Sequence, residues 1–212
     1  MRIEIRDLRK KDYKKAIQFA ITGMHFDWYL NNKFLLNAYG RYFWYLELNR
    51  ATQIFAAYVN GKFAGVLLAE IKGEKRKQQS VPGKIYVGLV GMIQRKLFKG
   101  GAGLYEKTTK EQLAHYLKSY TPDGEILFLA ADQDCKIKGI GTALLHALEA
   151  KEKGKTFYLY TDDVCTYQFY EHRGFERAEE NRIRNAKRES SVKMLPLQQE
   201  VVIHAGLYRK SH

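Results

Sequence analysis

The sequence predicts a mixed α/β fold in one domain, with a β-sheet flanked by helices. Strand-like segments with period-2 alternation are interspersed with segments of helical spacing. An Asn-Gly pair joins two β-prone runs, and a continuous apolar run is followed by a glycine-containing loop and an amphipathic helix. A length of 212 residues is usual for one domain, and we expect a single domain over 1–212 with an insertion at about 73–121.

The first elements follow from apolar spacing. Arg2–Leu8 alternates like a half-buried strand, and Asp12 is placed to cap the helix that follows, whose Ala16 and Ala20 recur at helical spacing. The aromatic-rich stretch Asn31–Asn49 predicts a second helix.

Two apolar runs, Ile54–Val59 and Phe63–Ile71, predict an antiparallel hairpin because Asn60-Gly61 between them tolerates the positive φ of a type I′ turn. The composition then changes from Gly73 onward. We expect this insertion to be helical, with a helix over Thr109–Tyr120 that begins with capping-box spacing.

The remaining chain returns to an alternation of strands and helices. Ile126–Ala131 predicts a buried strand, followed by a loop and a helix that Gly154 ends. Further on we expect a strand, a short helix and two closing strands separated by the charged segment 182–193; these four elements cover Thr156–Tyr160, Val164–Arg173, Phe175–Asn181 and Val201–Tyr208.

Composition excludes several classes of protein. With 45% hydrophobic residues and three prolines, the chain is not a disordered tail, and two cysteines cannot build a disulfide scaffold. The longest apolar stretch, Phe63–Ala69, is too short to span a membrane. We therefore expect a soluble, cytoplasmic protein with neither a membrane partner nor a metal. The net charge of +13 indicates an anionic partner.

The segment Lys136–Thr142 has the features of a phosphate-binding turn. Two glycines allow close backbone approach, the N–H groups at the start of the helix lack partners, and Lys136 and Lys138 add positive charge. Neither a Walker A loop nor a GxGxxG dinucleotide motif is present in the sequence.

Two motifs resemble the GCN5-related N-acetyltransferase (GNAT) family. Lys136–Gly141 matches the family's acetyl-CoA motif (Gln or Arg, two residues, Gly, one residue, Gly or Ala), with Lys in the first place. Tyr170–Phe175 matches its later Tyr-Glu, two residues, Gly-Phe pattern. The resemblance implies a mostly antiparallel, twisted sheet that is splayed at the acetyl-CoA site, with the helical insertion between the third and fourth strands.

The resemblance also implies the residues that bind acetyl-CoA, the co-substrate. The pantetheine arm would meet the end of the buried strand, and the pyrophosphate would meet the turn. The expected cofactor-binding residues are Leu129, Ala130, Ala131, Lys136, Ile137, Lys138, Gly139, Ile140, Gly141, Thr142, Thr166 and Phe169.

Tyr170 stands where many family members have the tyrosine that protonates the departing thiolate, and a phenol suits that role because its pKa is about 10. Glu70 and Asp163 are the expected catalytic carboxylates on the acceptor side, with Asp132 and Asp162 as alternatives. Asp163 replaces the family's frequent Asn. With no His paired to Cys165, direct transfer is favoured over an acyl-cysteine intermediate.

We therefore expect an acetyl-CoA-dependent N-acyltransferase that acts on an amine. The alternatives are a basic nucleic-acid-binding module, for which no fold signature is present, and a catalytically silent CoA sensor. A homodimer is compatible with the late strand Val201–Tyr208. The acceptor amine cannot be identified from the sequence.

Overall fold

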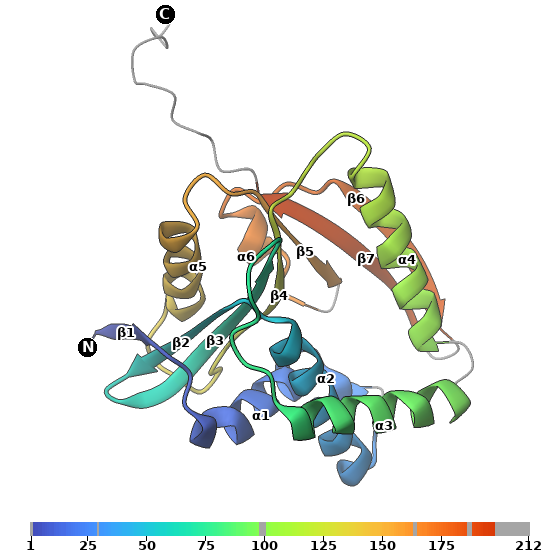
Figure 1. The fold of residues 1–212 in the computed structure, drawn as a ribbon, viewed down its shortest axis with the longest axis horizontal. Coiled ribbons are helices and arrows are strands. Elements are labelled where there is room, and N and C mark those ends of the chain that lie inside the picture. Colours follow the sequence, from blue (N-terminus) through green and yellow to red (C-terminus); the bar gives the residue numbers. More distant parts are fainter. Residues whose placement is uncertain (1, 29, 98–100, 163–164, 186–187, 198–212) are drawn as a thin grey trace, which may run out of the picture.

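The computed structural model describes residues 2–28, 30–97, 101–162, 165–185 and 188–197. In these residues a seven-stranded sheet has the order β1-β2-β3-β4-β5-β7-β6 (Figure 1). The strands are β1 (Ile3–Arg6), β2 (Gln53–Val59), β3 (Lys62–Ile71), β4 (Gly124–Ala131), β5 (Phe157–Asp162), β6 (Glu179–Asn185) and β7 (Arg188–Leu197). Neighbouring strands are antiparallel except β4 and β5, which are parallel. The predicted mixed, mostly antiparallel sheet is therefore confirmed.

Helices cover both faces of the sheet. The α-helices are α1 (Tyr13–Gly23), α2 (Lys33–Arg50), α3 (Val81–Leu97), α4 (Gly101–Tyr116), α5 (Ile140–Lys151) and α6 (Gln168–Glu171). Short 3-10 helices cover Lys10–Asp12 and Phe26–Trp28. The predicted helical insertion between the third and fourth strands is confirmed, because α3 and α4 lie there.

Two apolar cores lie on the two faces of the sheet. On one face, Leu144 and Leu148 of α5 pack against β2–β5. On the other face, α1 and α2 pack against β2–β4, with Trp44 fully buried. A smaller cluster joins Tyr116 of α4 to Tyr158 of β5 and Met194 of β7. The two faces of the sheet are thus covered by different helices.

The hairpin turn is confirmed. Asn60 has a φ of 50° and Gly61 a φ of 75°, so both residues adopt the left-handed conformation that the turn needs. Asp12 does occupy the position before α1, but its side chain makes no cap hydrogen bond. Its carboxylate instead accepts hydrogen bonds from Arg9 Nε (2.8 Å) and from the Tyr58 hydroxyl (2.7 Å).

Two predictions about element boundaries were wrong. Helix α4 begins at Gly101, so Thr109 lies inside it and is not a cap; its carbonyl accepts a hydrogen bond from the Tyr160 hydroxyl. The segment 182–193, expected as a charged separator, forms most of β6 and β7. At the end of this segment, Lys193 is 2% exposed and its Nζ lies 3.1 Å from Glu180 Oε1. The expected strand Val201–Tyr208 lies outside the described residues.

Candidate active site

An opening in the sheet lies between β4 and β5. These strands are paired only at Gly124–Phe157 and Glu125–Tyr158, although β4 continues to Ala131 and is paired with β3 as far as that residue. The closed end is fixed by hydrogen bonds from Asp123 and Gly124 N–H to the Thr156 carbonyl (2.9 and 3.2 Å). Beyond Glu125, the edge of β4 that faces β5 has no strand partner among the described residues, as the predicted splay requires.

Leu129, Ala130 and Ala131 lie on the part of β4 that is paired with β3 but not with β5, and they are half-buried. Alternate residues of a strand direct their backbone groups toward opposite edges. The opening therefore presents free N–H and C=O groups to any extended ligand that enters it. Across the gap on β5, the buried Thr161 hydroxyl has no hydrogen-bond partner within the described part of the chain.

The predicted phosphate turn lies where β4 meets α5. Gly139 precedes the helix with a φ of 85°, and no side chain caps the helix there. The first turn of α5, formed by Ile140, Gly141 and Thr142, therefore presents backbone N–H groups without helical acceptors. Lys136 and Lys138 are exposed beside it, whereas Ile137 packs against the core.

Phe169 and Arg173 lie against the start of α5. A Cβ atom on Gly141 would lie 2.8 Å from Cζ of the Phe169 ring, so the ring occupies the space that any other residue would fill. The Arg173 guanidinium stacks 3.7 Å from the centre of that ring. It also donates to Thr142 Oγ1 through Nη2 (2.6 Å) and Nε (3.1 Å). Thus the turn after α6 brings a cation to the start of α5.

Sequence reasoning missed Arg173, which follows Phe169 by four residues and lies two positions beyond the end of α6. The predicted Thr166 is exposed in the loop before α6, and its carbonyl accepts a hydrogen bond from Phe169 N–H (3.0 Å). The predicted helix over Val164–Arg173 is shorter in the structure, which contains only α6.

Tyr170 is packed edge-to-face between two phenylalanines. The ring centres lie 5.1 Å from Phe169 and 5.6 Å from Phe175. Burial raises the pKa of the Tyr170 hydroxyl, and the nearby Cys165 thiol raises it further. The phenol is therefore protonated at neutral pH. Among the described residues no hydrogen bond involves its hydroxyl, which leaves that group available to a ligand.

The predicted carboxylate Glu70 is bound to Arg50. Arg50, at the end of α2, donates to Glu70 Oε2 through Nε (3.1 Å) and Nη2 (2.9 Å). The same Nη2 lies 2.6 Å from Glu125 Oε2, and Nη1 lies 3.2 Å from Glu47 Oε2. We call Glu47, Arg50, Glu70 and Glu125 the Arg50 cluster. Three carboxylates thus surround one guanidinium beside the closed end of the opening.

Glu125 is the member of the Arg50 cluster that belongs to the opening itself, because it is the last β4 residue paired with β5. The Tyr158 hydroxyl donates to Glu125 Oε2 at 3.4 Å. Burial raises the pKa of Glu47 to about 7, although the Arg50 charge opposes this rise. Sequence reasoning missed Glu47 and Glu125. The one signal for Glu125 was that it is a charged residue in the otherwise apolar sequence of β4.

The other predicted carboxylates are either occupied or outside the description. Asp132 binds the Lys15 ammonium and accepts a hydrogen bond from Asp134 N–H (3.0 Å). Asp163 and the side chain of Asp162 lie outside the described residues. Among the described residues, no group of three His, Cys, Asp or Glu could hold a metal ion.

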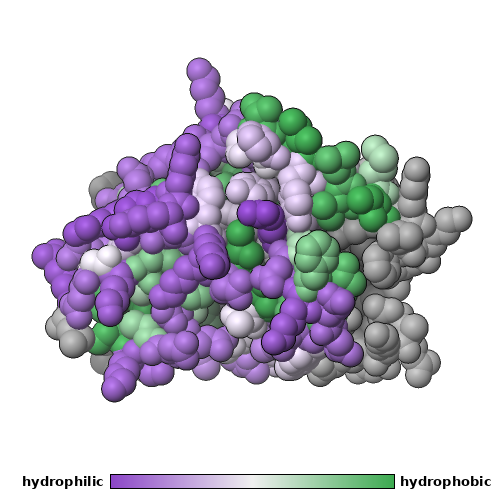
Figure 2. Space-filling model, turned by 90° about the horizontal axis from the view of Figure 1, so that it is seen from below, coloured by the Kyte–Doolittle hydropathy of each residue, from purple (hydrophilic) through white to green (hydrophobic). Residues whose placement is uncertain are grey.

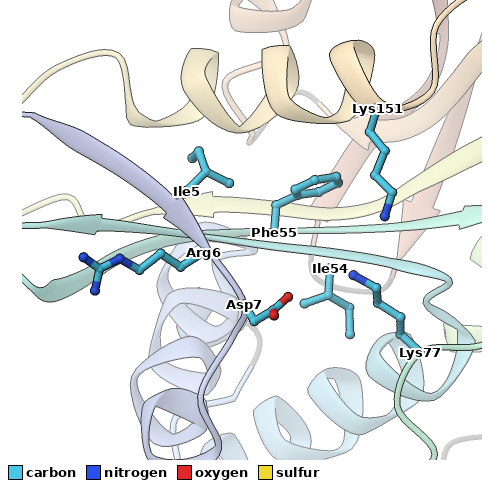
Figure 3. Close-up of a pocket in the computed structure, with 7 residues that line it drawn as sticks. All are labelled: Ile5, Arg6, Asp7, Ile54, Phe55, Lys77 and Lys151. Carbon is cyan, nitrogen blue, oxygen red and sulfur yellow. The ribbon is translucent and has the colours of Figure 1, made fainter.

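A separate cleft of about 350 Å³ lies on the β1–β2 side of the sheet (Figure 3). The residues that line it are Ile5, Arg6, Asp7, Ile54, Phe55, Lys77 and Lys151. The Lys151 ammonium is already bonded to Gln53 Oε1 at 2.6 Å. Because β3 separates this edge from β4, the cleft is not part of the opening described above.

Comparison with known proteins points to one family. The family described as "Acetyltransferase (GNAT) family" matches residues 24–175, and no curated protein matches the chain. Similar solved structures include the PaiA N-acetyltransferase of Thermoplasma acidophilum in complex with coenzyme A (16% identity, 94% of this chain and 100% of that chain, TM-score 0.55). A structure described as histone acetyltransferase HPA2 and related acetyltransferase, from Corynebacterium glutamicum, is similar (15% identity, 95% of this chain and 100% of that chain, TM-score 0.57). The polyamine N-acetyltransferase of Drosophila melanogaster, which forms N-acetylagmatine, is also similar (12% identity, 93% of this chain and 100% of that chain, TM-score 0.53).

Proposed function

Since the chain belongs to the acetyltransferase (GNAT) family, we propose that it transfers an acetyl group from acetyl-CoA directly to an amine. The observation that carries this proposal is the opening between β4 and β5. We infer that its unpaired strand edge, the uncapped start of α5 and the protonated Tyr170 belong to one site.

The opening fits the chemistry of acetyl-CoA. The pantetheine arm carries amide groups, so it can hydrogen-bond to the free edge of β4 at Leu129–Ala131 as an additional strand would. The unpartnered Thr161 hydroxyl offers a further hydrogen bond to it. The pyrophosphate suits the N–H groups at the start of α5, together with Lys136, Lys138 and Arg173.

Acetyl transfer needs three things of the protein: a donor to the thioester oxygen, an acid for the sulfur and an acceptor for the amine proton. In this proposal a backbone N–H near Ala130 or Ala131 donates to the thioester oxygen. The amine nitrogen attacks the carbonyl carbon, the carbon–sulfur bond breaks, and Tyr170 gives its proton to the thiolate. Its raised pKa keeps the Tyr170 phenol protonated at neutral pH, although it also makes the phenol a weaker acid toward the thiolate.

The amine proton leaves toward the Arg50 cluster. Glu125 is better placed than the predicted Glu70, since Glu125 stands at the edge where the strands part and Glu70 lies one strand farther away. Both carboxylates share Arg50, so the cluster can pass a proton between its members. Glu47, whose pKa is raised to about 7, is the member suited to hold the proton at neutral pH.

Titration calorimetry with acetyl-CoA and then a thiol-release assay test the proposal. The amine panel contains agmatine, spermidine and a lysine peptide, because the acceptor is unidentified. We expect acetyl-CoA to bind and Tyr170→Phe to retain that binding while turnover falls at least about tenfold. Tyr167→Phe is the matched control, since Tyr167 packs against the same core and we expect unchanged turnover.

Each alternative has a distinct outcome. Absence of acetyl-CoA binding would refute the proposal. Binding without transfer to any amine would favour the silent CoA sensor. An unchanged rate in Tyr170→Phe would remove Tyr170 as the acid, and full activity in Glu125→Gln would remove Glu125 from the proton path.

A further inference from the structure

Helix α3 is apolar on both of its sides. Its inner side, with Tyr86, Val87 and Val90, packs toward α2. Its outer side carries large apolar residues three or four positions apart, each 50–66% exposed: Val81, Ile85, Leu89, Met92 and Ile93. Such spacing is typical of a face that is buried against something, and a helix that is apolar all round is normally covered on all sides.

Helix α2, which packs against α3, also carries exposed apolar residues. Ser80 N–H bonds to the Asn49 side chain and the Tyr86 hydroxyl bonds to the Ala38 carbonyl, so α3 runs antiparallel to α2. Near the start of α2, Phe34 is 80% exposed and Leu35 is 49% exposed. We call these two residues and the five outer residues of α3 the α3 patch.

The α3 patch is larger than chance exposure explains. Seven large apolar side chains in one area make a surface of several hundred Å², which usually marks an interaction site. Figure 2 shows apolar side chains gathered on one side of the lower face, with hydrophilic side chains over much of the rest. A nucleic acid would not cover this area, since its phosphates need cations rather than aliphatic side chains.

The border of the α3 patch is basic. Lys33 precedes Phe34, Lys84 lies between Val81 and Ile85, and Arg41 lies 5.9 Å from the centre of the Tyr86 ring. Three further exposed cations, residues 75–77, come shortly before α3. Neither 33–46 nor 75–93 contains a single Asp or Glu. A second copy of the chain would therefore bring like charges together without a compensating carboxylate.

We propose that the α3 patch binds an anionic lipid bilayer surface, with α3 lying in the plane of the membrane. An apolar helix face bordered by Lys and Arg is the pattern of interfacial helices, which bury their apolar side chains at the headgroup boundary while cations meet anionic lipids. No helix of the described residues is long and apolar enough to cross a membrane. The absence of a spanning segment, which led to the expectation of no membrane partner, does not exclude such surface contact.

Vesicle flotation of the full chain tests the proposal without any acetyl transfer. The probes are vesicles of phosphatidylcholine alone and of phosphatidylcholine mixed with phosphatidylserine. We expect binding to the mixed vesicles only, and an affinity at least about tenfold lower for the double variant Ile85→Glu/Leu89→Glu, because two aliphatic side chains that would enter the bilayer are replaced by carboxylates. Leu117→Glu is the matched control, since Leu117 is also exposed but lies beyond the end of α4.

A second variant, Lys33→Glu/Lys84→Glu, tests the charge separately and is expected to lose binding to the mixed vesicles while its melting temperature stays unchanged. Light scattering after gel filtration is measured in parallel. Equal vesicle binding by the wild type and Ile85→Glu/Leu89→Glu would overturn the proposal. Absence of vesicle binding by the wild type would also overturn the proposal. This holds whether the wild type is a monomer or forms a dimer that Ile85→Glu/Leu89→Glu abolishes.

Discussion

Glu47 should make the protein less stable at neutral pH than at mildly acidic pH, and Glu47→Gln should remove this effect. Burial raises the pKa of Glu47 from 4.5 in the unfolded chain to about 7 in the folded chain. Between these values the folded state holds a proton that the unfolded state has released. The free energy of unfolding therefore falls as the pH rises through this window and levels off above it.

The magnitude follows from the size of the shift. One pKa unit corresponds to about 1.4 kcal/mol, so the carboxylate costs at most about 3 kcal/mol once it is ionised. Glutamine has the same shape and keeps a carbonyl oxygen for Arg50 Nη1. Arg50 also retains Glu70 and Glu125, so the substitution leaves no unpaired guanidinium.

Urea unfolding at pH 5 and pH 8 measures the effect. We expect Glu47→Gln to be more stable than the wild type at pH 8, and the advantage to shrink by about 2 kcal/mol at pH 5. Glu111→Gln is the control, since its side chain is 62% exposed and we expect no change in the difference between the two pH values. An advantage of Glu47→Gln that is the same at both pH values would refute the reasoning.

Three further substitutions test local packing by urea unfolding. Gly141→Ala should lower the free energy of unfolding by about 1–3 kcal/mol because its Cβ would overlap the Phe169 ring, and unchanged stability would mean that the ring moves without cost. Arg173→Lys should cost about 1 kcal/mol, since lysine cannot reproduce the paired donors to Thr142; an equal midpoint would show that this contact contributes nothing. Gly88→Ala should stabilise the protein by up to about 1 kcal/mol because the added methyl group meets open space, and a loss would contradict this.

The sequence predicted elements whose signals are local. The Asn60-Gly61 turn and the uncapped start of α5 depend on residues within a few positions of each other. The proposed phosphate turn and the proposed acid Tyr170 were singled out in the same way, through short motifs. By contrast, β7 was missed and β6 was placed too early, at Phe175–Asn181. The charged residues between 182 and 193 look solvated until Lys193 is placed beside Glu180 and the Tyr167 ring.

The Arg50 cluster could not be predicted from one sequence. Arg50 and Glu125 are 75 positions apart, and nothing local distinguishes Glu125 from an exposed carboxylate. Glu47 lies on a helix of mixed spacing, so neither its burial nor its raised pKa was visible before α2 was placed against the sheet. The exposure of the outer side of α3 could not be predicted either. Apolar spacing in a sequence does not tell whether another part of the same chain covers that face.

The two paired positions between β4 and β5 have a mechanical consequence. The sheet consists of two antiparallel plates, β1–β4 and β5–β7–β6, that share backbone hydrogen bonds at a single corner. An extended ligand in the opening would connect the two parts of the sheet by hydrogen bonds along the rest of β4. Hydrogen exchange at the amides of 126–131 should therefore slow when acetyl-CoA is added, whereas exchange within the β2–β3 hairpin should stay the same.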